Sequence, residues 1–244
     1  MSLAPTDYDF GVPANYAFAE KITCSNDEAR RMYVEAFGHM LNYNHEQAIA
    51  CFTKCTELDP NCAMAWWGIA YCLSSSYNWS AGLGPGYDAI SQAVSLKDHC
   101  SELEQDLIMA LSKRHTKEAR DNANPAALNM GNSPELNQAF ADAMAPLYEK
   151  YSGDLDVTAV YVEALMNLNP WTLWNKDAST GEITPVDDST LMLIKIMEDA
   201  FENVPGAKEH PALCHLYCHA LELSPYPERA LPAADVLRTL MPCL

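Results

Sequence analysis

Two histidines and a glutamate near the end of the chain have the spacing of a metal site on a helix. The segment from His210 to Glu222 is apolar around most of its circumference, which predicts a largely buried helix. At about 100° per residue, His219 lies about 40° to one side of His215 and Glu222 about 20° to the other, so the three share one face. Cys218 lies just beside them. Histidines at positions i and i+4 present two imidazoles to one ion, and a carboxylate or thiol nearby suits Zn, Cu or Fe.

The same side chains also fit a second interpretation, a hydrogen-bonded network in the core. Two imidazoles and a carboxylate inside a helical bundle need polar partners, and Glu222 would then orient a histidine ring. Two interpretations also fit His45. It is either an exposed residue in the first turn of a helix or a metal ligand contributed from another part of the fold. His39, on the preceding predicted helix, is a candidate for the same groove.

Two tryptophans lie in the long connection that precedes the histidine-bearing segment. Trp171 and Trp174 are separated by only two residues in this connection. Large aromatic side chains in a loop form either a plug over a bundle or the wall of a pocket, and we favour the plug. We therefore group them with His39 and Cys218 as residues that line or cover the predicted site.

The elements that must position these residues are predicted to be helices. Apolar residues recur at three- and four-residue steps through most of the chain after Asp27. This periodicity predicts about ten helices and no strand, over residues 27–40, 45–58, 62–74, 87–94, 101–115, 134–151, 156–167, 189–203, 211–223 and 227–241. Asn44 is predicted to cap the second helix, with Gln47 in the position that completes a capping box.

The first three predicted helices resemble the tetratricopeptide repeat, a unit of about 34 residues folded as two antiparallel helices. The small residue, the aromatic residue and the closing proline of the repeat fall on Ala48, Phe52 and Pro60, and the next aromatic position falls on Trp66. The match is strongest across residues 29–75. We expect Phe52 and Trp66 to be buried where one helix pair meets the next.

The resemblance implies an all-α fold, in which antiparallel helix pairs stack into an α-solenoid with long irregular loops. We expect an irregular lead-in over residues 1–26 and a single helical-repeat domain over residues 27–244. Degenerate repeats are expected over residues 87–167, and the histidine-bearing helices over residues 188–244. Such a stack has a concave groove that binds a peptide, a protein or a small molecule.

A second resemblance covers most of the chain and is to a poorly characterised, histidine-containing subgroup of tetratricopeptide-like proteins. It is carried by Asn44-His45-Glu46, Ala65-Trp66-Trp67-Gly68, Asn169-Pro170-Trp171, Leu173-Trp174 and the segment from His210 to Pro225. Proteins of that subgroup are longer, so we expect the sequence to continue beyond Leu244. The resemblance implies a repeat scaffold with a metal site and carries over no reaction.

The composition narrows the classes of partner. The formal net charge is −18, which argues against nucleic-acid binding and against a basic membrane-surface patch, because both need clustered Lys and Arg. No apolar run reaches the length of a membrane span, and nine cysteines without a signal peptide predict a reducing, cytoplasmic location. Two functions remain: a transition-metal protein, with catalysis left open, or a binding scaffold whose acidic groove prefers a basic ligand.

Overall fold

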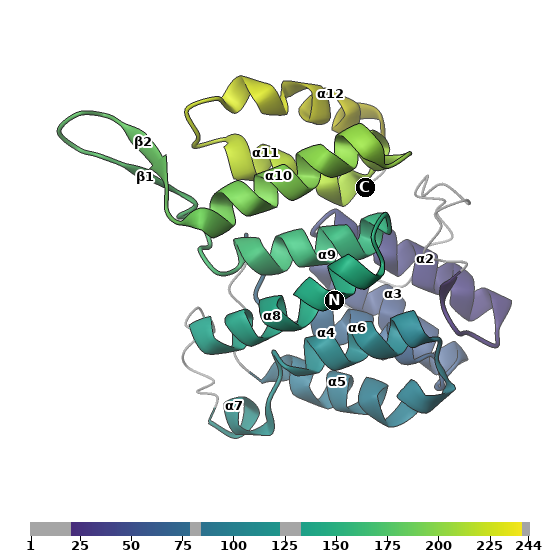
Figure 1. The fold of residues 1–244 in the computed structure, drawn as a ribbon. Helices are drawn as coiled ribbons and strands as arrows, with labels where there is room; N and C mark the ends of the chain where they lie inside the picture. The colour runs from purple at the N-terminus through teal and green to yellow at the C-terminus, as the bar shows by residue number, and fades with distance from the viewer. Residues whose placement is uncertain (1–20, 79–83, 123–132, 241–244) are drawn as a thin grey trace. The chain divides into compact units, whose positions relative to one another are not determined.

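A computed structural model of the chain describes residues 21–78, 84–122 and 133–240 (Figure 1). The described residues divide into two compact units. The first unit holds the residues up to Ser75 and those from 84 to Ala143. The second unit holds residues 76–78 and those from Met144 onward, so a short segment from the first third of the chain belongs with the C-terminal helices.

The first unit is built from consecutive helices that pack against their neighbours in the chain. Its elements are α2 (Asp27–Leu41), α3 (His45–Leu58), α4 (Ala63–Cys72), α5 (Pro85–Leu96), η1 (Lys97–His99), α6 (Glu102–Ser112), α7 (Lys117–Asp121) and the first part of α8 (Pro134–Lys150). Helix α3 packs between α2 and α4, and α5 packs between α4 and α6. The sequence predicts these helices except for two short ones, η1 and α7. Helix α7 follows Thr116, whose side chain caps it.

The core of the first unit contains one of the two aromatic residues that the repeat pattern places there, and a neighbour replaces the other. Phe52 is fully buried, as predicted, and Ala48 on the same helix is fully buried as well. Trp66 is only half-buried and its indole N–H donates to the carbonyl of Pro60, so the prediction of a buried Trp66 is wrong. The neighbouring Trp67 is the buried one, and its indole N–H donates to the carbonyl of Leu107 at 3.1 Å. The tryptophan of α4 that faces the core is thus one position later in the sequence than predicted.

The predicted capping box at the start of α3 is wrong. The backbone of Asn44 has φ −85° and ψ 64°, and its side chain makes no hydrogen bond to the helix. A capping side chain reaches the first-turn N–H groups from an extended backbone. That geometry occurs at Ser101, which has ψ 162° and forms a complete capping box with Glu104 at the start of α6.

The second unit packs its helices around α9 and α11. Its elements are the end of α8, α9 (Leu155–Met166), β1 (Trp174–Lys176), β2 (Ile183–Pro185), α10 (Asp188–Asn203), η2 (Ala207–Glu209), α11 (Pro211–Leu221), η3 (Pro227–Ala230) and α12 (Leu231–Leu240). Helix α9 packs against α10 and α11, and α11 packs against α12. The histidine-bearing segment is therefore a central helix of its unit, as its apolar circumference predicts.

The long connection before α10 contains a small β-hairpin, so the prediction of no strand is wrong. Strands β1 and β2 pair antiparallel, with Asn175 opposite Thr184, and the hairpin projects from the helices of its unit (Figure 1). Its turn is organised by Asp177, whose carboxylate accepts hydrogen bonds from the backbone N–H groups of Ser179 and Thr180. Gly181 supplies the positive φ of 74°. Strands of three residues are too short to produce a detectable alternation in the sequence.

The described structure is thus mostly helical, with adjacent helix pairs packed against each other. Across the described ranges, no helix combines the length and the apolar character that crossing a bilayer requires.

Candidate functional site

Helix α11 is positioned at its start by a buried polar pair. His210 is the residue before the helix, and its Nδ1 accepts a hydrogen bond from the backbone N–H of Leu213 at 3.3 Å. Its Nε2–H donates to Oδ1 of Asp156 on α9 at 3.1 Å, and both side chains are buried. The first histidine of the segment therefore locks α11 onto α9 and does not join the face of His215 and His219.

His219 has both ring nitrogens in hydrogen bonds. Its Nδ1 lies 2.8 Å from Oε1 of Glu222, and its Nε2 lies 2.9 Å from the side-chain nitrogen of Asn78. A carboxylate only accepts hydrogen bonds, so Nδ1 carries the proton and Nε2 is the acceptor for the Asn78 amide. Glu222 therefore fixes both the orientation and the tautomer of the ring, with the lone pair of Nε2 directed at Asn78.

His215 lies one helical turn earlier and faces the same region. The centroids of the His215 and His219 rings are 4.8 Å apart, and the ring planes are inclined by 38°. Burial lowers the pKa of His215 to about 4, with a smaller contribution from the neighbouring His219. His215 is therefore neutral at physiological pH, the state in which an imidazole can coordinate a metal ion.

Two aromatic rings flank His219. Tyr77 and Trp171 stack with their centroids 5.3 Å apart, and both rings contact His219, at 5.4 and 5.9 Å. Trp171 is 53% exposed and has a positive φ of 62°, which is unusual for a bulky residue. Burial, and then the charge of Glu222, raises the pKa of Tyr77 to about 12. The imidazole thus has aromatic faces beside it, one of them open to solvent.

The two tryptophans of the connection play different structural parts. Trp174 is buried, and its indole N–H donates to the carbonyl of Ala220 on α11 at 2.7 Å. Trp174 therefore covers part of α11. Trp171 instead lies at the surface beside the His219 ring, as a residue in the wall of a pocket would.

The structure brings together four of the predicted residues, namely His215, His219, Glu222 and Trp171. Cys218, on the same helix, is half-buried, and burial followed by the charge of Glu222 raises the pKa of its thiol. In the absence of a metal ion the thiol is therefore protonated at neutral pH.

His39 and His45 belong to the first unit. His39 is buried on α2, and burial lowers its pKa. His45 begins α3 with its ring 5.6 Å from that of Tyr43, and burial lowers its pKa to about 4. Its buried Nε2 has no hydrogen-bond partner within the described residues. His45 is thus half-buried rather than fully exposed.

Two residues of the site were not predicted from the sequence. Tyr77 and Asn78 lie in a turn-rich segment after α4, about 140 residues from His219, and helical periodicity carries no information about such a contact. The available signal is local: an aromatic and an amide side chain stand next to each other in an otherwise irregular stretch.

Over residues 21–78, 84–122 and 133–240, no group of three or more His, Cys, Asp and Glu side chains converges as a metal site would. Glu222 is directed at Nδ1 of His219 and not at a point shared with His215 and His219. In comparisons with protein-family models, curated proteins and solved structures, nothing matches this chain.

Proposed function

We propose that His215 and His219 bind a transition-metal ion of the Zn, Cu or Fe class. The observation that carries the proposal is the 4.8 Å separation of their ring centroids. Metal–nitrogen bonds of about 2.0–2.1 Å place each ring centroid about 3.2 Å from the ion, so two imidazoles at tetrahedral or square angles have centroids about 4.5–5.2 Å apart. The two rings have this spacing before any metal enters.

Glu222 has the position of an orienting residue rather than of a ligand. Histidines that bind metals commonly donate the second ring N–H to a carboxylate, which fixes the tautomer and makes the coordinating nitrogen more basic. The bond from Nδ1 of His219 to Glu222 is of this kind. The Asn78 amide then occupies the point at which a metal would meet Nε2, and it must move aside when an ion binds.

Two imidazoles leave coordination positions for water or for a small ligand. Tyr77 and Trp171 lie next to His219, so a ligand on the ion would contact their rings. This arrangement supports binding of an ion with an accessible face.

Metal stoichiometry tests the proposal directly. Protein purified without a His tag should take up about one equivalent of Zn(II), Cu(I) or Fe(II), and the His215→Ala and His219→Ala variants should lose it. The matched control is His99→Ala, which removes an exposed histidine of the first unit and should leave uptake unchanged. Far less than one equivalent of every ion in the wild type contradicts the proposal. Equal uptake by all the variants contradicts it as well.

A second candidate function is a scaffold of tetratricopeptide type that binds a partner in its groove. It is favoured by the order of packing in the first unit, where each of α2 to α5 packs against the next helix in the chain. We propose that these helices form the repeat stack and that the acidic chain selects a basic peptide. A lysine-rich peptide should bind with an affinity that falls as salt rises, whereas a glutamate-rich peptide of equal length should not bind. Equal binding of the two peptides contradicts the charge selection.

A further inference from the structure

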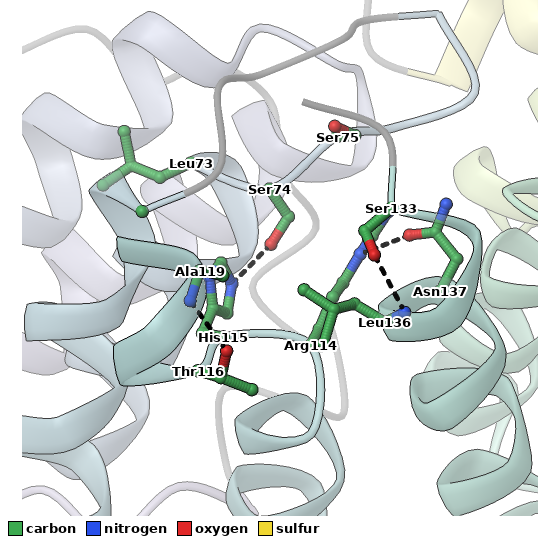
Figure 2. Close-up of a pocket in the computed structure, with 11 residues that line it drawn as sticks. Leu73, Ser74, Ser75, Arg114, His115, Thr116, Ala119, Ser133, Leu136 and Asn137 are labelled. Atoms are coloured by element: carbon green, nitrogen blue, oxygen red, sulfur yellow. Dashed lines mark hydrogen bonds between the residues drawn. The ribbon is translucent and has the colours of Figure 1, made fainter. Parts of the chain in front are cut away.

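A pocket in the first unit has a lining that is unusual for this chain. It lies where the end of α4, the connection between α6 and α7, and the start of α8 meet (Figure 2). The lining includes Arg114, His115 and the hydroxyl side chains of Ser74, Ser75, Thr116 and Ser133. Among the described residues that line this pocket there is no Asp or Glu, although the chain has 33 acidic residues and a net charge of −18.

Arg114 is the cationic group of this lining. Arg114 is 7% exposed, its Nε–H donates to Oδ1 of Asn137 at 3.0 Å, and its guanidinium lies over the ring of Phe140. These contacts hold the planar group in one orientation at the pocket. A guanidinium fixed in this way presents N–H donors in a fork that matches phosphate and carboxylate oxygens.

His115 completes the wall as a neutral ring. Ser74 donates its hydroxyl proton to the carbonyl of Ala70 at 2.9 Å, so Nε2 of His115 is the donor in its 2.8 Å contact with the Ser74 oxygen. The ring lies directly against Gly86, where an added Cβ would be 2.2 Å from Cε1 of His115. Burial and the charge of Arg114 lower the pKa of His115 to about 4. At neutral pH the charge of the lining is therefore that of Arg114.

The start of α8 forms one side of the pocket. Ser133 and Leu136 line it, and the backbone N–H of Leu136 donates to the Ser133 hydroxyl (Figure 2). The N-terminal end of a helix carries a partial positive charge, and in α8 the carboxylate of Glu135 in the first turn offsets it. Ser133 also donates to the carboxylate of Glu135, which is exposed and lies outside the lining.

We infer that this pocket binds a small oxyanion, a phosphate or carboxylate group, through the Arg114 guanidinium at the N-terminal end of α8. The Thr116 hydroxyl oxygen already accepts the backbone N–H of Ala119, so its proton is directed elsewhere and can be donated to the anion. The site is independent of the histidines of α11, which belong to the other unit.

The test uses the full chain at constant ionic strength, with inorganic phosphate and acetate as separate probes and chloride as the reference salt. At least one of the two oxyanions should raise the melting temperature of the wild type above that in chloride, and it should shift the NMR signal of the Arg114 Nε–H. Arg114→Gln should lose the stabilisation. Arg120→Gln, which removes a surface arginine paired with Asp88, should keep it.

Asn137→Asp keeps the size of the side chain and places a carboxylate beside Arg114. It should preserve the fold and weaken oxyanion binding by at least tenfold, so the test does not depend on the folding of Arg114→Gln. If phosphate alone raises the melting temperature, the pocket binds a tetrahedral anion. If acetate raises it, the pocket binds a carboxylate. The inference is overturned if neither ion acts beyond chloride, or if Asn137→Asp and the wild type respond equally.

Discussion

The imidazole rings of His215 and His219 lie 4.8 Å apart, one turn apart on α11, while Glu222 holds the proton-bearing nitrogen of His219 at 2.8 Å. The carboxylate thus acts on one side of the ring, and the other side faces Asn78. This division of the two ring nitrogens separates an orienting role for Glu222 from a coordinating role for His219, and the two roles can be tested with different substitutions.

Glu222→Ala should weaken metal binding by about 10- to 100-fold, because the imidazole loses the group that fixes its tautomer. Glu222→Gln should weaken it less, since the amide oxygen still accepts the Nδ1–H of His219. Calorimetric titration with Zn(II) measures both. Unchanged affinity in Glu222→Ala would show that the carboxylate has no part in the site.

Phe52 and Gly68 should be energetically coupled. The Phe52 ring lies against Gly68 so closely that an added Cβ would be 2.4 Å from it. Gly68→Ala should therefore cost about 1–3 kcal/mol by overpacking, and Phe52→Ala should cost about 3–5 kcal/mol. The double variant should lose less than the sum, because the new methyl group then occupies space that the ring has left. Urea unfolding of the wild type, the two single variants and the double variant measures these free energies. Strictly additive losses would contradict the contact between the Phe52 ring and Gly68.

The two helix starts of the first unit should respond differently to alanine. Ser101→Ala removes a capping box and should lower the free energy of unfolding by about 1 kcal/mol. Asn44→Ala is the matched control, because the Asn44 side chain makes no cap hydrogen bond, and it should change stability by less than about 0.5 kcal/mol. Chemical denaturation measures both changes in the free energy of unfolding. A loss larger than about 0.5 kcal/mol in Asn44→Ala would contradict the cap assignment.

His45 should make the fold less stable in acid. Its folded pKa is about 4, below the ordinary value of 6.5, because of burial. As the pH falls from 6.5 to 4 the unfolded chain takes up a proton that the folded chain does not, so the free energy of unfolding falls, by at most about 3 kcal/mol. His45→Gln should flatten this part of the curve, and the exposed-site control His99→Gln should not. Parallel pH curves for wild type and His45→Gln contradict the burial of this ring.

Helical periodicity was sufficient to predict where most helices lie, because each buries one stripe of apolar residues, as α3 does with Ala48 and Phe52. It also placed His215 and His219 on one face, since a helix of 3.6 residues per turn brings i and i+4 together. Contacts between distant segments could not be predicted in this way. Asn78 reaches His219 from a turn, and only tertiary packing determines that pairing.

The most direct measurement is the anomalous scattering of a Zn(II)-soaked crystal, collected on both sides of the zinc absorption edge. The account predicts one peak beside α11, about 2.0–2.1 Å from Nε2 of His219 and from a ring nitrogen of His215, with the Asn78 amide displaced and Glu222 still bonded to Nδ1. No peak at this place, with the bond between Asn78 and His219 unchanged, would contradict the central claim and leave the two histidines as a hydrogen-bonded network.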